Sequence, residues 1–154
     1  VRSGEGAEGR ELDRMIFVPA PEAPRLERPL FLSRVPAGLP AAAEDHVDGC
    51  LDLNEHLVEH RESTFYIRVQ GQSMTGAGIN DGDLLVVDRA LEAADGNIVV
   101  AMVDGELTLK RLHKRNGHVR LLPENPCFRP IEFEDGQELT IWGVATSVVH
   151  SLRR

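Results

Sequence analysis

The chain has little cysteine, and what it has is not arranged to bind a metal. Among its 154 residues are two cysteines, Cys50 and Cys127, which form neither a Cys-x-x-Cys pair nor a zinc-ligand spacing. We therefore expect two reduced thiols in a protein of the cytoplasm, with no metal and no other cofactor.

The chain also lacks long apolar runs and a surplus of basic residues. Its longest apolar run, residues 98–103, is far shorter than the roughly 20 residues of a transmembrane helix. The start shows no basic segment followed by an apolar one, as a signal peptide would. The net charge of −8 disfavours binding to a phosphate backbone. These absences predict a cytoplasmic protein with no membrane association and no direct, tight binding to duplex DNA.

The first 62 residues predict a flexible, extended N-terminal arm. Residues 1–14 are polar and glycine-rich, and prolines recur through residues 16–40, which excludes a regular helix and disfavours a central strand. Residues 44–62 carry seven acids against one arginine and allow two short helical turns. The better one has Asn54 as its N-cap and runs from Glu55 to His60.

Residues 56–60 match the pattern His-x-x-Glu-His, which some zinc peptidases use. His56 and His60 could bind zinc from one helix face, but the expected helix has barely two turns. No distal glutamate stands on a second clear helix. We favour a solvated acidic helix without metal.

From residue 63 onward, short apolar strands alternate with tight turns. Asp104-Gly105 and Asn116-Gly117 are typical of two-residue hairpins, and the last strand, residues 139–149, should bend or bulge at Gly143. The pattern predicts a mostly β domain over residues 63–154, with a small, highly twisted antiparallel fold. Its expected core residues are Phe65, Ile67, Val69, Leu85, Val87, Ile98, Val100, Leu121, Ile141 and Val144.

The stretch Gly71-Gln72-Ser73-Met74 follows a β-prone segment and lies among glycines that require a sharp turn. A serine on such a turn can expose its hydroxyl and its own amide on one side, as a nucleophile and its oxyanion hole require. Most serines in a Gly-x-Ser triplet are plain turn residues, so the interpretation depends on a base.

That base is sought first among the histidines, but none of the six is flanked by an obvious orienting acid. Lysine is the other option, in the serine–lysine variant of the catalytic pair. Lys110 lies in the apolar strand 107–112, where burial could lower the pKa of its amine. From position alone an exposed strand lysine is the simpler interpretation, and Asp83 or Asp88, if close, would favour the charged amine.

Three stretches together resemble the self-cleaving serine–lysine peptidases of the LexA, UmuD and phage-repressor family: residues 71–74, 78–83 and 103–112. The resemblance covers most of residues 30–150 and is strongest to UmuD-like members. It implies that the fold is that of the family's C-terminal domain.

The same resemblance assigns roles to individual residues. It implies Ser73 as nucleophile, Lys110 as general base, and the amides of Gln72 and Ser73 as oxyanion donors. It also implies self-cleavage in the proline-rich arm, between Ala37 and Gly38. The residue before the scissile glycine is alanine here, which resembles LexA more than UmuD, where this residue is often cysteine.

By the same resemblance, the protein belongs to the SOS response to DNA damage. The shortened product would be the accessory subunit of an error-prone translesion polymerase of the Y family (UmuC-like). A homodimer would be the working unit, and a RecA–single-stranded-DNA filament the activator.

Three alternatives stay open. A LexA-like transcriptional repressor needs an N-terminal helix-turn-helix, which the proline-rich start disfavours. A signal peptidase needs a membrane anchor. A non-cleaving protein-interaction module would be indicated if Ser73 and Lys110 lie far apart.

Overall fold

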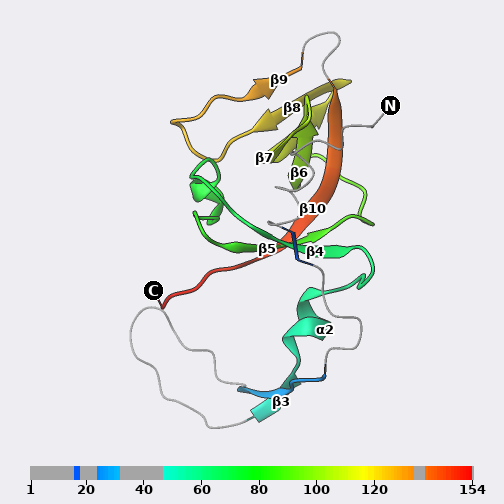
Figure 1. Ribbon diagram of the computed structural model, residues 1–154, viewed down its shortest axis with the longest axis vertical. Coiled ribbons are helices and arrows are strands. Elements are labelled where there is room, and N and C mark those ends of the chain that lie inside the picture. Colours follow the sequence, from blue (N-terminus) through cyan, green and yellow to red (C-terminus); the bar gives the residue numbers. More distant parts are fainter. Residues whose placement is uncertain (1–15, 18–23, 32–46, 134–137, 154) are drawn as a thin grey trace, which may run out of the picture.

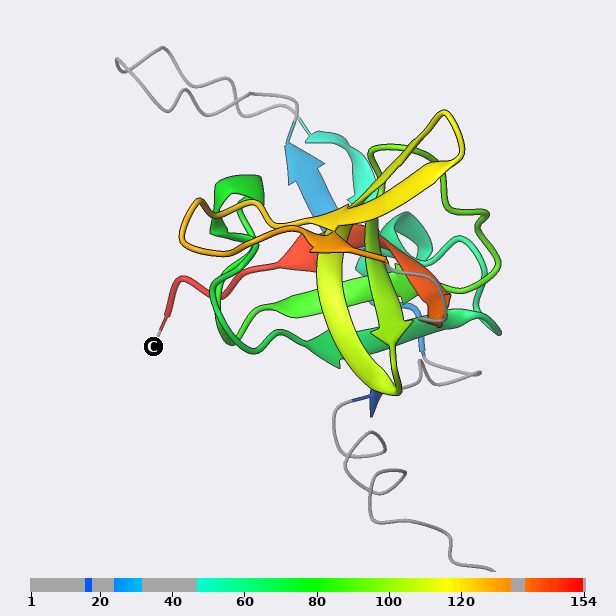
Figure 2. The ribbon, with the colours of Figure 1, turned by 90° about the horizontal axis from the view of Figure 1, so that it is seen from above.

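A computed structural model of the chain describes residues 16–17, 24–31, 47–133 and 138–153. In this part of the chain, eight strands form one antiparallel sheet in the order β1-β4-β5-β10-β6-β7-β8-β9 (Figure 1). Viewed from above, the sheet is strongly twisted (Figure 2). The predicted mostly β, twisted antiparallel fold is therefore confirmed. The strands are β1 (Ile16–Phe17), β4 (Thr64–Arg68), β5 (Leu84–Asp88), β6 (Ile98–Val103), β7 (Glu106–Arg115), β8 (His118–Leu122), β9 (Ile131–Glu132) and β10 (Leu139–Val149).

The twisted sheet buries side chains in two clusters, one on each side of β6. Val100 belongs to the first cluster, whereas its neighbours Val99 and Ala101 belong to the second, because successive side chains of a strand point to opposite faces. Of the predicted core, six residues are buried: Ile67, Leu85, Val87, Val100, Leu121 and Val144. The other four, Phe65, Val69, Ile98 and Ile141, are only partly buried.

The long strand β10 pairs with both β5 and β6 and is bulged at the predicted place. Its register with β6 shifts between Ile141 and Gly143. A Cβ atom on Gly143 would lie 2.7 Å from Cγ1 of Val87, so glycine is needed there for the close approach of β5. The prediction of a bend or bulge at Gly143 is confirmed.

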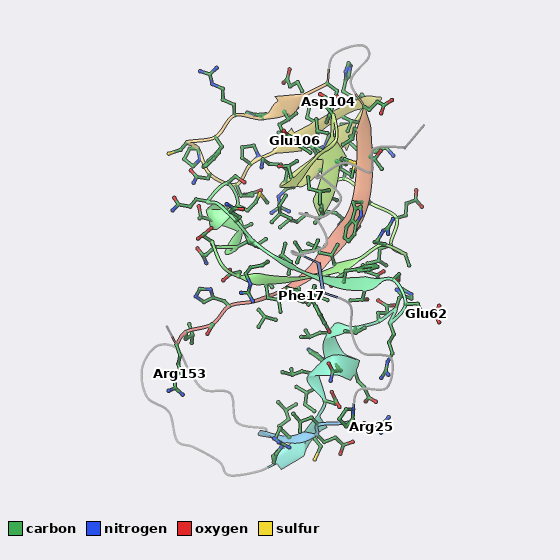
Figure 3. All side chains as sticks on the ribbon, viewed as in Figure 1. Phe17, Arg25, Glu62, Asp104, Glu106 and Arg153 are labelled. Atoms are coloured by element: carbon green, nitrogen blue, oxygen red, sulfur yellow. The ribbon has the colours of Figure 1, made fainter. Side chains whose placement is uncertain are left out.

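The two predicted hairpin turns are also present. Asp104 and Gly105 join β6 to β7, and Asn116 and Gly117 join β7 to β8; all four residues have positive φ, as such tight turns require. Figure 3 shows Asp104 near the top of the view, at one end of the large sheet. Strand β9 was not predicted, because it directly follows Pro123, Pro126 and Pro130, which indicate a loop.

A second, two-stranded sheet lies between β1 and β4 in the sequence. Strand β2 (Arg28–Phe31) pairs with β3 (Val47–Leu51), and the helix α2 (Leu53–Leu57) follows directly (Figure 1). The described part of the acidic stretch 44–62 therefore contains a strand as well as a helix, where the sequence allowed two short helical turns. No described helix has the length and apolar character to cross a bilayer.

The helix α2 also differs from its prediction at both ends. Its N-cap is Asp52, not Asn54, because the Asp52 carboxylate accepts a hydrogen bond from the Asn54 amide at 2.8 Å. The other carboxylate oxygen accepts from the Leu26 amide at 2.8 Å, which ties the segment just before β2 to the start of the helix. The helix ends at Leu57, since Val58 has extended backbone angles, and so it does not reach His60.

Candidate active site

The sharp turn predicted around Ser73 lies between β4 and β5. Gly71 has a φ of 93°, and its amide donates to the Asp81 carboxylate at 2.6 Å. A single 3-10 turn, η1 (Thr75–Ala77), follows the serine. Met74 is only 2% exposed and packs in the first core cluster, which anchors the turn and leaves the neighbouring Ser73 half-buried.

Lys110 approaches this turn from the middle of β7. Its Nζ lies 3.0 Å from Oγ of Ser73, although the two residues are 37 positions apart in the sequence. The same Nζ is 3.0 Å from Oγ1 of Thr108 and 3.0 Å from the carbonyl oxygen of Leu109. The predicted pair therefore lies within hydrogen-bonding distance.

The surroundings of Lys110 favour its neutral form. The residue is 8% exposed, and this burial lowers the pKa of its amine. A carboxylate close to Lys110 would stabilise the charged amine, but neither Asp83 nor Asp88 is a partner of Lys110. Asp83 binds His150 and Asp88 binds His60, and among the described residues no carboxylate forms an ion pair with Lys110.

The hydrogen bonds of Lys110 leave a place for the serine proton. A neutral amine has two N–H groups and one lone pair. The Leu109 carbonyl can only accept and the Thr108 hydroxyl can accept, so both N–H groups can be directed to them. The lone pair then faces Ser73. Sequence reasoning missed Thr108, although its position two residues before Lys110 on a strand puts both side chains on one face.

The two amides expected to be oxyanion donors have no hydrogen-bond acceptor within the described part of the chain. Neither the Gln72 nor the Ser73 amide donates a hydrogen bond there. In contrast, the carbonyl oxygens of both residues accept hydrogen bonds. Gln72 O accepts from Asn125 Nδ2 and Ser73 O accepts from the Glu124 amide, both at 2.8 Å. The prolines of this stretch indicate a loop, but the sequence does not indicate that the loop contacts the serine turn.

Three histidines do have a carboxylate partner, which the sequence did not indicate. His60 Nδ1 lies 2.6 Å from Asp88, His150 Nδ1 lies 2.5 Å from Asp83, and a longer contact of 3.5 Å joins His113 to Asp95. The partners come from distant positions in the sequence, so flanking residues could not reveal them. The Oγ of Ser73 nevertheless has Lys110, and not a histidine, as its hydrogen-bond partner.

The His-x-x-Glu-His match does not form the helical pair that zinc peptidases use. His56 is on α2, but the helix ends before His60, whose ring binds Asp88 instead. Within the described residues, no group of three or more histidine, cysteine or acidic side chains could hold a metal ion. Ala37 and Gly38, the expected cleavage site, lie outside the described residues.

Several known proteins are similar to this chain over most of its length. The family described as Peptidase S24-like matches residues 29–146. Protein SamA of Salmonella typhimurium is 40% identical over 141 residues, which cover 90% of this chain and 98% of SamA. Protein ImpA of Escherichia coli is 42% identical over 127 residues, covering 82% of this chain and 86% of ImpA. The LexA repressor of Cupriavidus taiwanensis is 41% identical over 141 residues, which cover 92% of this chain but 64% of LexA.

Proposed function

Because this chain belongs to the Peptidase S24-like family, we propose that it is a serine peptidase that cleaves itself, with Ser73 as nucleophile and Lys110 as general base. The observation that carries the proposal is the 3.0 Å contact between Oγ of Ser73 and Nζ of Lys110. A lysine amine accepts a proton only when it is neutral, and burial of Lys110 favours this neutral form because it lowers the pKa of the amine.

We infer the reaction from the chemistry of this pair and from the expected cleavage site. Oγ of Ser73 attacks the carbonyl carbon of Ala37 while its proton passes to Nζ of Lys110. The carbonyl oxygen gains the negative charge and accepts hydrogen bonds from the amides of Gln72 and Ser73. When the intermediate collapses, the C–N bond breaks and Lys110 gives the proton to the amine of Gly38. Water then hydrolyses the ester by the same route, which leaves a carboxyl group on Ala37 and restores Ser73.

The bond between Ala37 and Gly38 is proposed on its residue types and on the reach of the arm. A small residue before the bond and a glycine after it suit a narrow site, and the surrounding prolines favour an extended chain. The 35 positions from Gly38 to Ser73 could span up to about 3.3–3.6 Å each, so the bond can reach Ser73 of the same or a neighbouring subunit.

The product that begins at Gly38 is proposed to act in the SOS response as a homodimeric accessory subunit of a Y-family translesion polymerase. The resemblance to UmuD-like proteins supports this role, as does a match that covers nearly the whole of SamA. A RecA–single-stranded-DNA filament is the proposed activator. The similarity to the LexA repressor favours a second candidate, a role in transcriptional repression.

Intact-mass spectrometry of the purified full chain tests the peptidase proposal. During incubation at alkaline pH, the chain should yield one fragment that ends at Ala37 and one that begins at Gly38. The variant Ser73→Ala should fold normally and lose cleavage by orders of magnitude, because the catalytic pair acts as a unit. Ser151→Ala, which removes an exposed hydroxyl near the C-terminus, is the matched control. Undiminished cleavage by Ser73→Ala would refute the mechanism.

A further inference from the structure

The loop that follows β8 binds the turn of Ser73 by three hydrogen bonds. The Glu124 amide donates to Ser73 O at 2.8 Å, and the Gly76 amide donates to Glu124 O at 2.6 Å. The side chain of Asn125 donates from Nδ2 to Gln72 O at 2.8 Å. The two segments are so close that a Cβ atom on Gly76 would lie 2.4 Å from Glu124 O. The loop therefore determines the shape of the turn on either side of the serine.

The bond from Asn125 has a specific consequence for the amide of Ser73. The carbonyl of Gln72 and the N–H of Ser73 belong to one planar trans peptide, in which these two groups point in opposite directions. A donor that fixes Gln72 O therefore also fixes the direction of the Ser73 N–H. That N–H is one of the two proposed oxyanion donors. Asn125 is the nearer donor to Gln72 O at 2.8 Å, and Oγ1 of Thr75 donates to the same oxygen at 3.3 Å.

The side chain of Asn125 is itself held in one orientation. Its Oδ1 accepts a hydrogen bond from the Cys127 amide at 3.0 Å, while Nδ2 faces Gln72 O. Because a backbone amide can only donate and a carbonyl can only accept, these two neighbours assign the oxygen and the nitrogen of Asn125 without ambiguity.

The loop is also tied to the strand that carries Lys110. Arg111, the next residue on β7, binds the carboxylate of Glu124 through Nε and donates from Nη1 to Gly96 O at 2.6 Å. Both side chains of this ion pair are about one-third exposed, at 34% and 29%. The loop, the serine turn and the lysine strand thus form one connected unit.

We propose that Asn125 is a positioning residue for the self-cleavage reaction, which aims the amide of Ser73 at the oxyanion through the carbonyl of Gln72. This inference rests on the proposed function, because it concerns the same reaction. Hydrogen-bond donors to an oxyanion must be aligned in advance, and a misplacement of about 1 Å can cost about a hundredfold in rate. Loss of the Asn125 donor should therefore slow cleavage by about ten- to a hundredfold.

Two variants separate this role from simple support of the loop. Asn125→Ala removes both hydrogen bonds of the side chain. Asn125→Asp keeps an oxygen for the Cys127 amide but cannot donate to Gln72 O. If the side chain only held the loop, the aspartate variant would cleave like the wild type. Asn116→Asp, with the same chemical change in the turn between β7 and β8, is the matched control.

The experiment measures self-cleavage of the full chain against pH, together with the melting temperature. We expect both Asn125 variants to have a plateau rate at alkaline pH at least about tenfold below that of the wild type and of Asn116→Asp. Asn125→Ala should keep the wild-type pH midpoint, because Lys110 is untouched, and both variants should be folded at the assay temperature.

The possible results distinguish this inference from the proposed function. A wild-type plateau rate in Asn125→Asp, or a loss explained by unfolding, overturns the role of Asn125 and leaves the peptidase proposal intact. A shifted midpoint in Asn125→Ala also overturns it, since the residue would then act on the lysine. A wild-type chain that never cleaves at any pH overturns both.

Discussion

Lys110 is the residue on which the chemistry of this site depends. It is a buried amine with three hydrogen-bond partners, and the described chain gives it no carboxylate to stabilise its charge. Burial favours the neutral form, which is the form that can accept the proton of Ser73. At low pH the lysine is charged and cannot accept the proton of Ser73. The rate of self-cleavage should therefore rise with pH as the neutral fraction of the lysine increases.

The pH dependence of self-cleavage should report the titration of Lys110. Below the lowered pKa of the lysine, each pH unit upward raises its neutral fraction, and with it the rate, about tenfold; above that pKa the rate is constant. A histidine base would instead reach its plateau near pH 7. Cleavage rates of the full chain from about pH 6 to about pH 11 check this.

The chain offers a matched control for that measurement. Lys114 lies on the same strand as Lys110 but is exposed. We expect Lys110→Ala to abolish cleavage and Lys114→Ala to leave the profile unchanged. A flat profile above pH 7, or an active Lys110→Ala protein, would remove lysine from the mechanism.

His60 should affect stability and not cleavage. Its hydrogen bond to Asp88 raises the pKa of its ring above the ordinary value of about 6.5. The stabilisation is therefore fully present below that value and is lost as the pH rises through the raised pKa. His60→Gln should lower the melting temperature more at about pH 5.5 than at about pH 9, whereas the control His118→Gln should show no such trend. A penalty that grows with pH would contradict the assigned direction.

At the scale of elements, β7 joins the parts of the site. Thr108 and Lys110 share one face of the strand, where Nζ of Lys110 contacts both Thr108 and Ser73. Arg111 reaches the loop that holds the serine turn. The alternation of side chains along a strand lets one element support both the base and the loop. Pairing with β6 and β8 fixes the strand on both sides.

The bulge in β10 should depend on the absence of a side chain at Gly143. A methyl group there would meet Cγ1 of Val87 and come within 3.2 Å of Asp88 O. Gly143→Ala should therefore destabilise the protein by about 1–3 kcal/mol, the usual cost of overpacking. Gly49→Ala is the control, since a Cβ atom at Gly49 would have no neighbour within 4 Å. Equal unfolding midpoints of the two variants in urea would contradict this reading.

At the scale of the whole molecule, the charge separates the two candidate roles. The full chain carries a net charge of −8, which repels a phosphate backbone. The purified chain should therefore show no tight, salt-sensitive binding to duplex DNA, whereas its product from Gly38 onward should dimerise and bind a Y-family polymerase. Fluorescence anisotropy with labelled duplex DNA at low and high salt checks the first statement. Tight binding that weakens steeply with salt would favour the repressor role.

The sequence by itself determined most of the architecture. Apolar alternation and the dipeptides Asp104-Gly105 and Asn116-Gly117 predicted antiparallel strands and hairpins, and a glycine in a long strand predicted the bulge at Gly143. These features are local, because side-chain alternation and backbone angles depend on neighbouring residues. The family resemblance carried by residues 71–74 and 103–112 also implied which two residues should meet.

Only the tertiary structure decided what surrounds that pair. The contact between Asn125 and Gln72 spans 53 positions, and the one between His60 and Asp88 spans 28, so no local pattern could indicate them. The pairing of β2 with β3 is also non-local, and so is the bond from the Leu26 amide to Asp52. Burial of Lys110, which favours its neutral form, likewise exists only once the strands have packed around it.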